Sequence, residues 1–521
     1  MPANMSHQQE YDAIIIGSGF GGAMTAHVLV NAGMKVLMLE RGDWVERGPQ
    51  NWAADGSVDL TPYYSKEIQY RVLAGGNSPV MGAYTCVGGP SVFYGAVSMR
   101  FREADFEPAP EIVSASGARW PFGYAQLAPY YRQAERILNI AGESGQDPTE
   151  PPRDTPYPQK LNTLSETSQM LKAAAERLGF APFRLPLAIN YALNGHQPGC
   201  EACPTCDTFA CAIQAKNDLA TRVLPELITK GLELRPNTIA VELVSENSKI
   251  QSVVCYDKIR QDTAAYTAGT VVLSAGALAS AHLLLASGLE KLNPGGHTVG
   301  RYLTRHCNAI AFGFFPKNPN PRNEFHKQLA IHDFYFGHTT IREPAGKLGS
   351  MQQLQTPPVG LVQALVPRPF GRLLGLGVPH LTGLLVMAED QPRYDNHVAV
   401  DPAQVDRFGL PQLLVTHHYT ARDTAARDAL LQKAKEILKE AGALFCYLHK
   451  IKTFSHAVGT VRMGPEPETS ALDPHCRFRG LDNLFVVDGS FMPTSGGLNP
   501  SLTISANALR VGEYLVNTQT R

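Results

Sequence analysis

The sequence predicts an α/β fold in which a Rossmann-like dinucleotide-binding domain is assembled from separated segments and an α+β substrate domain, with a mixed or antiparallel sheet, is inserted into it. One observation is a strand–glycine loop–helix–strand pattern over residues 11–42. The other is that further strand–helix pairs suited to a nucleotide domain occur near 270–290 and 484–515. This interleaving favours insertion over two consecutive domains.

The N-terminal unit has the parts that a dinucleotide site needs. Residues 13–16 form a short apolar run, which is typical of a parallel strand buried on both faces. A helical pattern then runs to about Ala32, with Gly33 as its C-terminal cap. A second apolar run, residues 36–39, ends in Glu40, whose carboxylate would accept hydrogen bonds from a ribose.

Between the first strand and the helix lies a G-x-G-x-x-G sequence that spans residues 17–22. Gly17 permits the tight turn, Gly19 lets a pyrophosphate approach the backbone, and Gly22 lets the helix pack on the strand. The unpaired N–H groups at the helix N-terminus are suited to bind phosphate. The strand, the helix and the acidic residue around this loop distinguish it from a chance glycine pattern.

The later elements follow from apolar periodicity and from proline and glycine positions. Residues 147–158 form a proline-rich crossing segment without a stable element. Residues 359–387 are apolar but interrupted by prolines and basic residues, so we expect mainly strand and loop there, with a membrane-facing or substrate-gating lid as the lesser alternative. We expect helices at 171–178, 216–230, 277–287, 424–441 and 501–515, and strands at 232–244, 250–256, 270–275 and 484–487.

Composition excludes several classes of function. The 521 residues carry a net charge of -1 without a dense basic patch, which argues against nucleic-acid binding. No uninterrupted apolar run reaches the roughly 18 residues of a transmembrane helix. The N-terminal residues have no apolar core of a secretory signal, so the cytoplasm is the expected location.

Three stretches near the C-terminus form a second constellation: SHAVGTVRMG at 455–464, LFVVDGS at 484–490 and LNPSLT at 498–503. Here the chain resembles the glucose–methanol–choline (GMC) flavin oxidoreductases. The resemblance covers nearly the whole length. It also includes CVGGPSVFYGAVSMR at 86–100, VVLSAGALASAHLLLASG at 271–288 and VGRYLTRH at 299–306.

The resemblance implies FAD as the cofactor, with its ADP half on the first strand–helix unit. It implies that one set of residues lies beside the flavin and that another closes over it near the C-terminus. The expected cofactor contacts are Gly17, Gly19, Phe20, Gly22, Glu40, Arg41, Gly88, Gly89, Ser91, Val241, Ala275, Gly276, Asp488, Gly489, Asn499, Pro500 and Thr503.

The resemblance also implies the catalytic pair. His456 aligns with the family's catalytic histidine, and Asn499 takes the partner position, which is His or Asn in the family. A neutral imidazole is suited to accept the hydroxyl proton of an alcohol at neutral pH. The amide of Asn499 can hydrogen-bond the substrate oxygen and hold the carbinol carbon near flavin N5, which takes the hydride.

The chain departs from the family pattern at several positions. Pro90 and Tyr94 replace a small residue and an asparagine that are common in the glycine segment, and this could alter the loop beside the flavin. Ala281 and Glu290 depart from the second signature. Phe93 stands where some members attach FAD through a histidine, so we predict non-covalent FAD.

Four of the nine cysteines cluster as C-x2-C-x2-C-x4-C in the loop 199–211. Thiolates at this spacing can converge on an Fe–S cluster, which would pass electrons to an outside acceptor. A structural loop, with reduced or disulfide-paired cysteines, and a zinc site are the alternatives. The candidate ligands are Cys200, Cys203, Cys206 and Cys211.

These observations predict an FAD-dependent alcohol dehydrogenase or oxidase that passes electrons to oxygen or, more readily, to a quinone or protein acceptor. The rivals are a non-redox flavin-containing lyase of the same family and an Fe–S/flavin electron-transfer subunit. The apolar segment 359–387 slightly favours a hydrophobic or bulky substrate. The FAD-binding domain is expected at 8–105, 212–315 and 450–521, and the substrate domain at 106–211 and 316–449.

Overall fold

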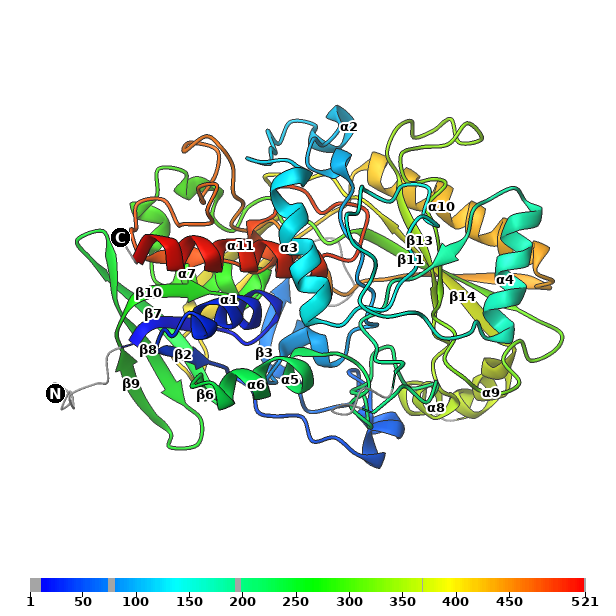
Figure 1. Cartoon of the computed structure of the whole chain (residues 1–521), viewed down its shortest axis with the longest axis horizontal. Coiled ribbons are helices and arrows are strands. Elements are labelled where there is room, and N and C mark those ends of the chain that lie inside the picture. The colour runs from blue at the N-terminus through cyan, green and yellow to red at the C-terminus, as the bar shows by residue number, and fades with distance from the viewer. Residues whose placement is uncertain (1–10, 74–79, 193–197, 368, 520–521) are drawn as a thin grey trace.

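The computed structural model describes residues 11–73, 80–192, 198–367 and 369–519. The N-terminal residues 1–10, on which the absence of a secretory signal was judged, lie outside the described part of the chain. Figure 1 shows a parallel sheet with its helices in one half of the molecule and a second, antiparallel sheet in the other half. The chain therefore has an α/β fold with sheets of both kinds.

The parallel sheet has five strands in the order β18-β10-β1-β2-β6 and joins segments from both ends of the chain. All residues of β2 and β18 are buried, as the continuous apolar runs predict. Its strands are β1 (Tyr11–Ile16), β2 (Val36–Leu39), β6 (Glu233–Arg235), β10 (Ala268–Leu273) and β18 (Leu484–Val486).

Helices from distant parts of the sequence surround the parallel sheet. The first helix, α1 (Phe20–Asn31), packs against the last, α11 (Ser501–Gln519), and the two lie side by side in Figure 1. They approach so closely that a Cβ atom on Gly512 would lie 2.9 Å from the Cβ of Val28. A further helix, α7 (Ala277–Ala286), follows β10 as predicted.

The second sheet has six antiparallel strands in the order β17-β11-β14-β13-β12-β5. Alternation gives it two faces: Ala309, Val386 and Met351 contribute to a core with helix α10 (Ala421–Glu440), while Asn308 and Gln352 lie on the other face. Its strands are β5 (Phe183–Arg184), β11 (Cys307–Phe314), β12 (Leu329–Ile331), β13 (Gly349–Leu354), β14 (Leu381–Ala388) and β17 (Phe445–Lys450).

Two smaller sheets complete the strands, in the orders β15-β16-β3-β4 and β7-β8-β9. Their strands are β3 (Tyr64–Val72), β4 (Val80–Tyr84), β7 (Thr238–Glu246), β8 (Lys249–Asp257), β9 (Asp262–Tyr266), β15 (His397–Val405) and β16 (Pro411–Thr416). The remaining helices are α2 (Pro110–Val113), α3 (Tyr124–Ile137), α4 (Glu166–Arg177), α5 (Leu219–Arg222), α6 (Leu224–Thr229), α8 (Val359–Leu365) and α9 (Phe370–Gly377).

The prediction of mainly strand and loop over 359–387 is wrong for its first part, which forms α8 and α9, and right for β14. The prolines do not prevent these helices: Pro358 and Pro369 are their N-caps, where a missing N–H costs nothing. Arg368 lies outside the described residues. Of the part of the chain that is described, no helix has the length and apolarity needed to cross a membrane.

Two other segments are more divided than predicted. Residues 216–230 form two short helices, with Pro225 near the start of the second, and residues 232–244 form β6 and β7 on either side of a turn at Pro236 and Asn237. The proposed division into two discontinuous domains stays a prediction.

Candidate functional site

The three fingerprint glycines occupy three different environments. Gly17 has a φ of 100°, and a Cβ there would lie 2.3 Å from the carbonyl oxygen of Ser274. A Cβ on Gly22 would lie 2.0 Å from the carbonyl oxygen of Gly17, whereas one on Gly19 would meet no atom within 4 Å. The turn and the helix contact are thus closely packed, and the space beside Gly19 is open.

The start of α1 is suited to bind an anion. Gly19 is its N-cap, no side chain caps it, and its first turn holds no acidic residue, so its first N–H groups are unsatisfied by the helix. A Cβ on Gly89 would have its nearest neighbour, the Cα of Gly19, at 3.4 Å, so the two glycine segments face one another. These residues fit the pyrophosphate of a dinucleotide.

Glu40 is buried at the end of β2 and organises this loop. Its Oε2 accepts hydrogen bonds from the backbone N–H and the hydroxyl of Ser18, at 3.0 and 2.6 Å, and its Oε1 accepts one from the N–H of Gly42 at 3.0 Å. The Ser18 hydroxyl oxygen also accepts the N–H of Gly88 at 2.9 Å. One carboxylate therefore joins the fingerprint to the glycine segment that precedes Ser91.

Other predicted cofactor residues lie on neighbouring elements. The Phe20 ring packs 5.5 Å from that of Tyr94, and the Arg41 side chain hydrogen-bonds Tyr70. Val241 lies where the register of β7 against β8 shifts. The Ser91 hydroxyl donates to the Gly88 carbonyl at 2.7 Å.

Asp488 links the ends of two parallel strands. Its carboxylate accepts the N–H of Gly276, which follows Ala275 after β10, at 3.0 Å, and the N–H of Ser490 at 2.9 Å, as well as the hydroxyl of Ser280. Burial raises the pKa of this carboxyl group. Asp488 therefore holds the loop that carries Gly489 against the start of α7.

His456 is largely buried, on a segment that pairs with the Asp488 loop. The N–H groups of Gly459 and Val461 donate to the carbonyls of Gly489 and Ser490, at 3.0 and 2.9 Å. Burial, then the neighbouring imidazole of His306 and the charge of Lys327, lowers the pKa of His456 to about 3. The ring is therefore neutral and able to accept a proton.

The Nδ1 of His456 lies 3.1 Å from the Nδ1 of His306, whose Nε2 lies 3.1 Å from the carbonyl oxygen of Ser495. Among the described residues, no protein group is recorded as a hydrogen-bond partner of His456 Nε2. One ring nitrogen is engaged and the other is available to a reactant.

Asn499 contacts the second sheet. Its Oδ1 accepts a hydrogen bond from Gln352 Nε2 on β13 at 3.2 Å. This leaves the amide N–H groups of Asn499 as the donors for another molecule. Pro500 is buried beside it, and Thr503 Oγ1 lies 2.7 Å from the hydroxyl of the buried Tyr131.

Buried groups fix the loop that connects the His456 region to Asn499. The N–H of Gly496 donates to Glu389 Oε1 at 2.9 Å, and that of Gly497 donates to the hydroxyl oxygen of Tyr335 at 3.0 Å. Tyr335 donates in turn to Asp105, and the ammonium of Lys347 is paired with both Asp105 and Glu389. The backbone before Asn499 is therefore held on both sides.

The arrangement of the cysteine loop does not support the Fe–S cluster that was one of the predicted alternatives. Within the described ranges no group of three or more His, Cys, Asp or Glu side chains is arranged to hold a metal. All nine cysteines are unpaired thiols. Burial raises the pKa of Cys200 to about 12 and that of Cys206 further.

A buried lysine organises that loop. Lys216 Nζ donates to the carbonyls of Tyr94, Cys206 and Phe209 at 2.9, 3.0 and 2.7 Å. The ammonium thus joins the loop to the glycine segment, as expected for the structural alternative.

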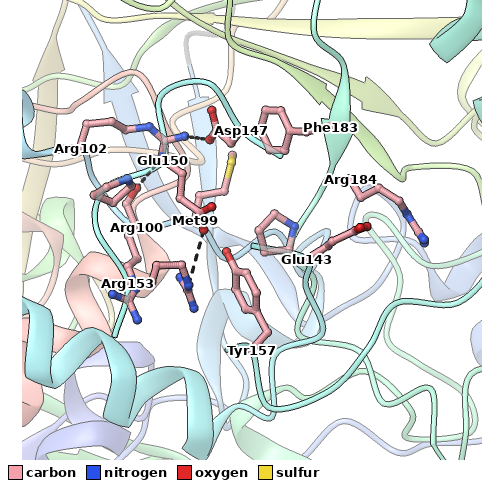
Figure 2. A pocket seen from close by; sticks show the side chains of 12 residues that line it. Met99, Arg100, Arg102, Glu143, Asp147, Glu150, Arg153, Tyr157, Phe183 and Arg184 are labelled. Carbon is pink, nitrogen blue, oxygen red and sulfur yellow. Dashed lines mark hydrogen bonds and ion pairs between the residues drawn. The ribbon is translucent and has the colours of Figure 1, made fainter. Parts of the chain in front are cut away.

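A charged pocket, drawn in Figure 2, lies apart from the predicted site residues, none of which lines it. Several of its charges are paired: Arg102 with Asp147, and Arg153 with Glu150 and with Glu135. These ion pairs hold the proline-rich segment 147–158 in place.

Sequence reasoning missed two residues of this site, His306 and Gln352. His306 ends the segment VGRYLTRH, which was noted without a role. The sequence signal that could have identified His306 is that this polar residue directly precedes the apolar strand β11. Gln352 gave no signal, because its partner is 147 positions away.

A family model described as GMC oxidoreductase matches residues 11–308, and a second of the same description, for the C-terminal part, matches 392–508. Among curated relatives, paromamine 6'-oxidase of Streptomyces fradiae is 30% identical over 96% of this chain and 90% of its own length. 2-Methyl-1,2-propanediol dehydrogenase of Mycolicibacterium austroafricanum is 28% identical over 97% of the chain and 95% of the relative.

The large subunit of fructose dehydrogenase from Gluconobacter japonicus is 25% identical over 97% of this chain and 98% of its own length. Among solved structures, pyridoxine 4-oxidase from Mesorbium loti superposes with a TM-score of 0.66 at 18% identity, over 97% of this chain and 99% of that one. The similarity to pyridoxine 4-oxidase shows that the two chains share a fold.

Proposed function

Because the chain belongs to the GMC oxidoreductase family, a family of flavoproteins, we propose that it binds FAD non-covalently and oxidises a CH–OH group of a small alcohol. His456 is the base that takes the hydroxyl proton, and Asn499 orients the substrate oxygen. When bound, the flavin supplies the hydride acceptor. The observation that carries this proposal is the neutral His456 ring with one ring nitrogen engaged and the other available.

The glycine environments support the cofactor assignment. Gly17 and Gly22 allow the close packing that brings the N-terminus of α1 to the open space beside Gly19. Glu40, held at the end of β2, is the proposed partner of the adenosine ribose. Phe93, where some relatives have the histidine that attaches FAD, supports non-covalent binding.

The face of the second sheet that contacts Asn499 supports a hydroxylated substrate. Three of its side chains have a buried oxygen without a hydrogen-bond partner among the described residues: Asn308 Oδ1, Ser350 Oγ and Gln352 Oε1. Unpaired buried oxygens are costly and call for donors from a bound molecule. We therefore propose a polar, hydroxyl-bearing substrate.

This replaces the slight preference for a hydrophobic substrate. That preference rested on residues 359–387, where the large apolar side chains of the two helices are mostly exposed: Leu365, Phe370, Leu373, Leu374 and Leu376 are half or more exposed. The relatives named for paromamine, propanediol and fructose agree with a hydroxylated substrate.

The decisive experiment is anaerobic mixing of the FAD-loaded protein with a panel of sugars, amino sugars, diols and aromatic alcohols, followed by flavin absorbance. We expect at least one hydroxylated compound to bleach the flavin, and its deoxy analogue to leave it oxidised. Flavin that no alcohol bleaches would favour the lyase. Reoxidation by oxygen, by a quinone or by a dye then separates oxidase from dehydrogenase.

A further inference from the structure

His306 lies between the base and a backbone carbonyl. Its side chain is buried, and its two ring nitrogens are both engaged: Nε2 lies 3.1 Å from the carbonyl oxygen of Ser495, and Nδ1 lies 3.1 Å from Nδ1 of His456. The two rings are nearly perpendicular, at 86°, with centroids 5.2 Å apart. These contacts form a chain from a carbonyl to the base.

With both imidazoles neutral, the carbonyl at one end determines the position of every ring proton in the chain. A carbonyl oxygen only accepts, so Nε2 of His306 must carry its proton. In a neutral imidazole the other nitrogen then has the lone pair, so Nδ1 of His306 accepts. The hydrogen on the bond to His456 must therefore come from His456 Nδ1. This leaves the lone pair of His456 on Nε2, the nitrogen for which the described residues provide no hydrogen-bond partner.

The backbone around His306 is fixed by groups that do not touch the base. Asp390 accepts the N–H groups of Arg305 and His306 at 2.8 and 3.0 Å, and the Tyr419 hydroxyl donates to the carbonyl of His306 at 2.7 Å. This maintains a positive φ of 61° at His306. Asp390 also accepts the Ser495 hydroxyl at 2.9 Å. One carboxylate therefore binds both His306 and Ser495, the residue whose carbonyl accepts from the His306 imidazole.

We propose that His306 is a positioning residue that holds His456 in the Nδ1–H tautomer, with the Nε2 lone pair directed to the substrate hydroxyl. This inference rests on the proposed function of His456. The hydroxyl proton passes to His456 Nε2, the carbinol carbon gives up a hydride that the flavin would accept when bound, and a carbonyl product remains. The imidazolium so formed keeps its Nδ1–H bond to His306, which stabilises it without a second proton transfer.

The first test observes the tautomers directly and needs no turnover. In FAD-loaded protein labelled with 15N-histidine, long-range 1H–15N spectra separate protonated from unprotonated ring nitrogens, and a His456→Gln variant assigns the His456 signals. We expect His456 with a protonated Nδ1 and an unprotonated Nε2, and His306 with the reverse. The opposite tautomer at His456, or a doubly protonated His306, overturns the proposal.

The second test uses two variants of similar size. His306→Asn places an acceptor near the position of Nδ1 and tolerates a positive φ, whereas His306→Leu removes the acceptor. We expect His306→Leu to slow flavin reduction by up to about 10²–10⁴-fold, the contribution of a general base, with substrate affinity changed only a few-fold. His306→Asn should recover most of that loss.

The two readouts separate the proposals. If no alcohol reduces the flavin, the proposed oxidation fails, while the NMR spectrum still decides the tautomer. If the spectrum is as expected but His306→Leu, shown to be folded by its melting temperature, reduces flavin as fast as the unmodified protein, the positioning role is wrong and the assignment of His456 as base is untouched.

Discussion

The amide nitrogen of Gln352 lies 3.2 Å from Oδ1 of Asn499, and this contact determines which end of the asparagine amide faces a substrate. It joins the antiparallel sheet to the loop before α11. The next residue on the same strand, Gln353, points to the opposite face, where its Oε1 accepts hydrogen bonds from the Ser168 hydroxyl at 2.9 Å and from the N–H of Gln328 at 3.3 Å.

These adjacent glutamines give a matched pair of substitutions. Gln352→Met removes the donor to Asn499, and we expect kcat/KM to fall about fivefold, the equivalent of one hydrogen bond of about 1 kcal/mol. Gln353→Met should lower the melting temperature instead, because it removes a buried acceptor from the Ser168 hydroxyl and the N–H of Gln328. Steady-state kinetics and thermal unfolding of both variants check this. Equal kinetic losses in the two would contradict it.

The glycine environments predict that two Gly→Ala variants fail differently. Gly19→Ala adds a methyl group where no protein atom lies within 4 Å, so we expect a folded protein whose FAD affinity falls at least about tenfold. Gly22→Ala places a methyl 2.0 Å from the Gly17 carbonyl and should destabilise the fold itself. Gly123→Ala, whose methyl would be 3.6 Å from the nearest atom, is the control.

Calorimetry with FAD and denaturant titration of the FAD-free protein distinguish these outcomes. A Gly19→Ala variant that bound FAD with unchanged affinity would show that the pyrophosphate does not bind at this loop.

The parts of the fold that depend on neighbouring residues could be predicted from the sequence. Residues 36–39 form a strand with the predicted bounds, and α1 ends within one residue of the expected position, because apolar period and glycine positions act locally. Residues 359–377 were misjudged, because prolines that interrupt an apolar run can equally be caps of short helices.

The candidate site was only partly predictable for a different reason. His456 and Asn499 come from recognisable segments, but the contacts that orient them come from His306, 150 positions from His456, and from Gln352 on another sheet. Neither contact leaves a local pattern. The cysteine spacing was compatible with a cluster, yet spacing cannot show that Lys216 donates to the carbonyls of this loop.

The lowered pKa of His456 predicts the pH dependence of catalysis. Its free ring is neutral down to a pH of about 3, so the base is in its accepting form throughout the ordinary range. We expect kcat/KM for an alcohol to show no acid limb near 6.5, the ordinary imidazole value. A profile between about pH 5 and 8 measures this. An acid limb at 6.5 that disappears in a His456→Gln variant with residual activity would contradict the assignment.

Buried neutral histidines also predict a loss of stability in acid. Burial lowers the pKa of His282 and His326 to about 4, and that of His456 to about 3. Below 6.5 the unfolded chain binds protons that the folded chain does not, so the free energy of unfolding falls as pH falls, by up to about 1.4 kcal/mol per pH unit for each ring. Stability must fall in acid because each of these histidines has a lower pKa in the folded protein than in the unfolded chain.

Denaturant titrations of the FAD-free protein across this range measure the slope. His326→Gln should make it shallower by about one histidine's contribution. A slope that this variant leaves unchanged would show that His326 is protonated in the folded protein.

The final prediction concerns the cysteine loop. The ammonium of Lys216 donates hydrogen bonds to the carbonyls of Tyr94, Cys206 and Phe209. Lys216→Met leaves three buried carbonyls without this donor, at about 1–3 kcal/mol each in the unfavourable limit, so we expect the free energy of unfolding to fall by at least about 2 kcal/mol. Lys230→Met, which removes an exposed pair with Glu226, should cost less than about 1 kcal/mol. Anaerobically purified protein should contain no stoichiometric iron, because the side chains of the described residues in this loop are not arranged to hold a metal. If the preparation contained iron, and a Cys206→Ser variant lost both the iron and stability, the Fe–S hypothesis would be supported and the structural role of Lys216 would be wrong.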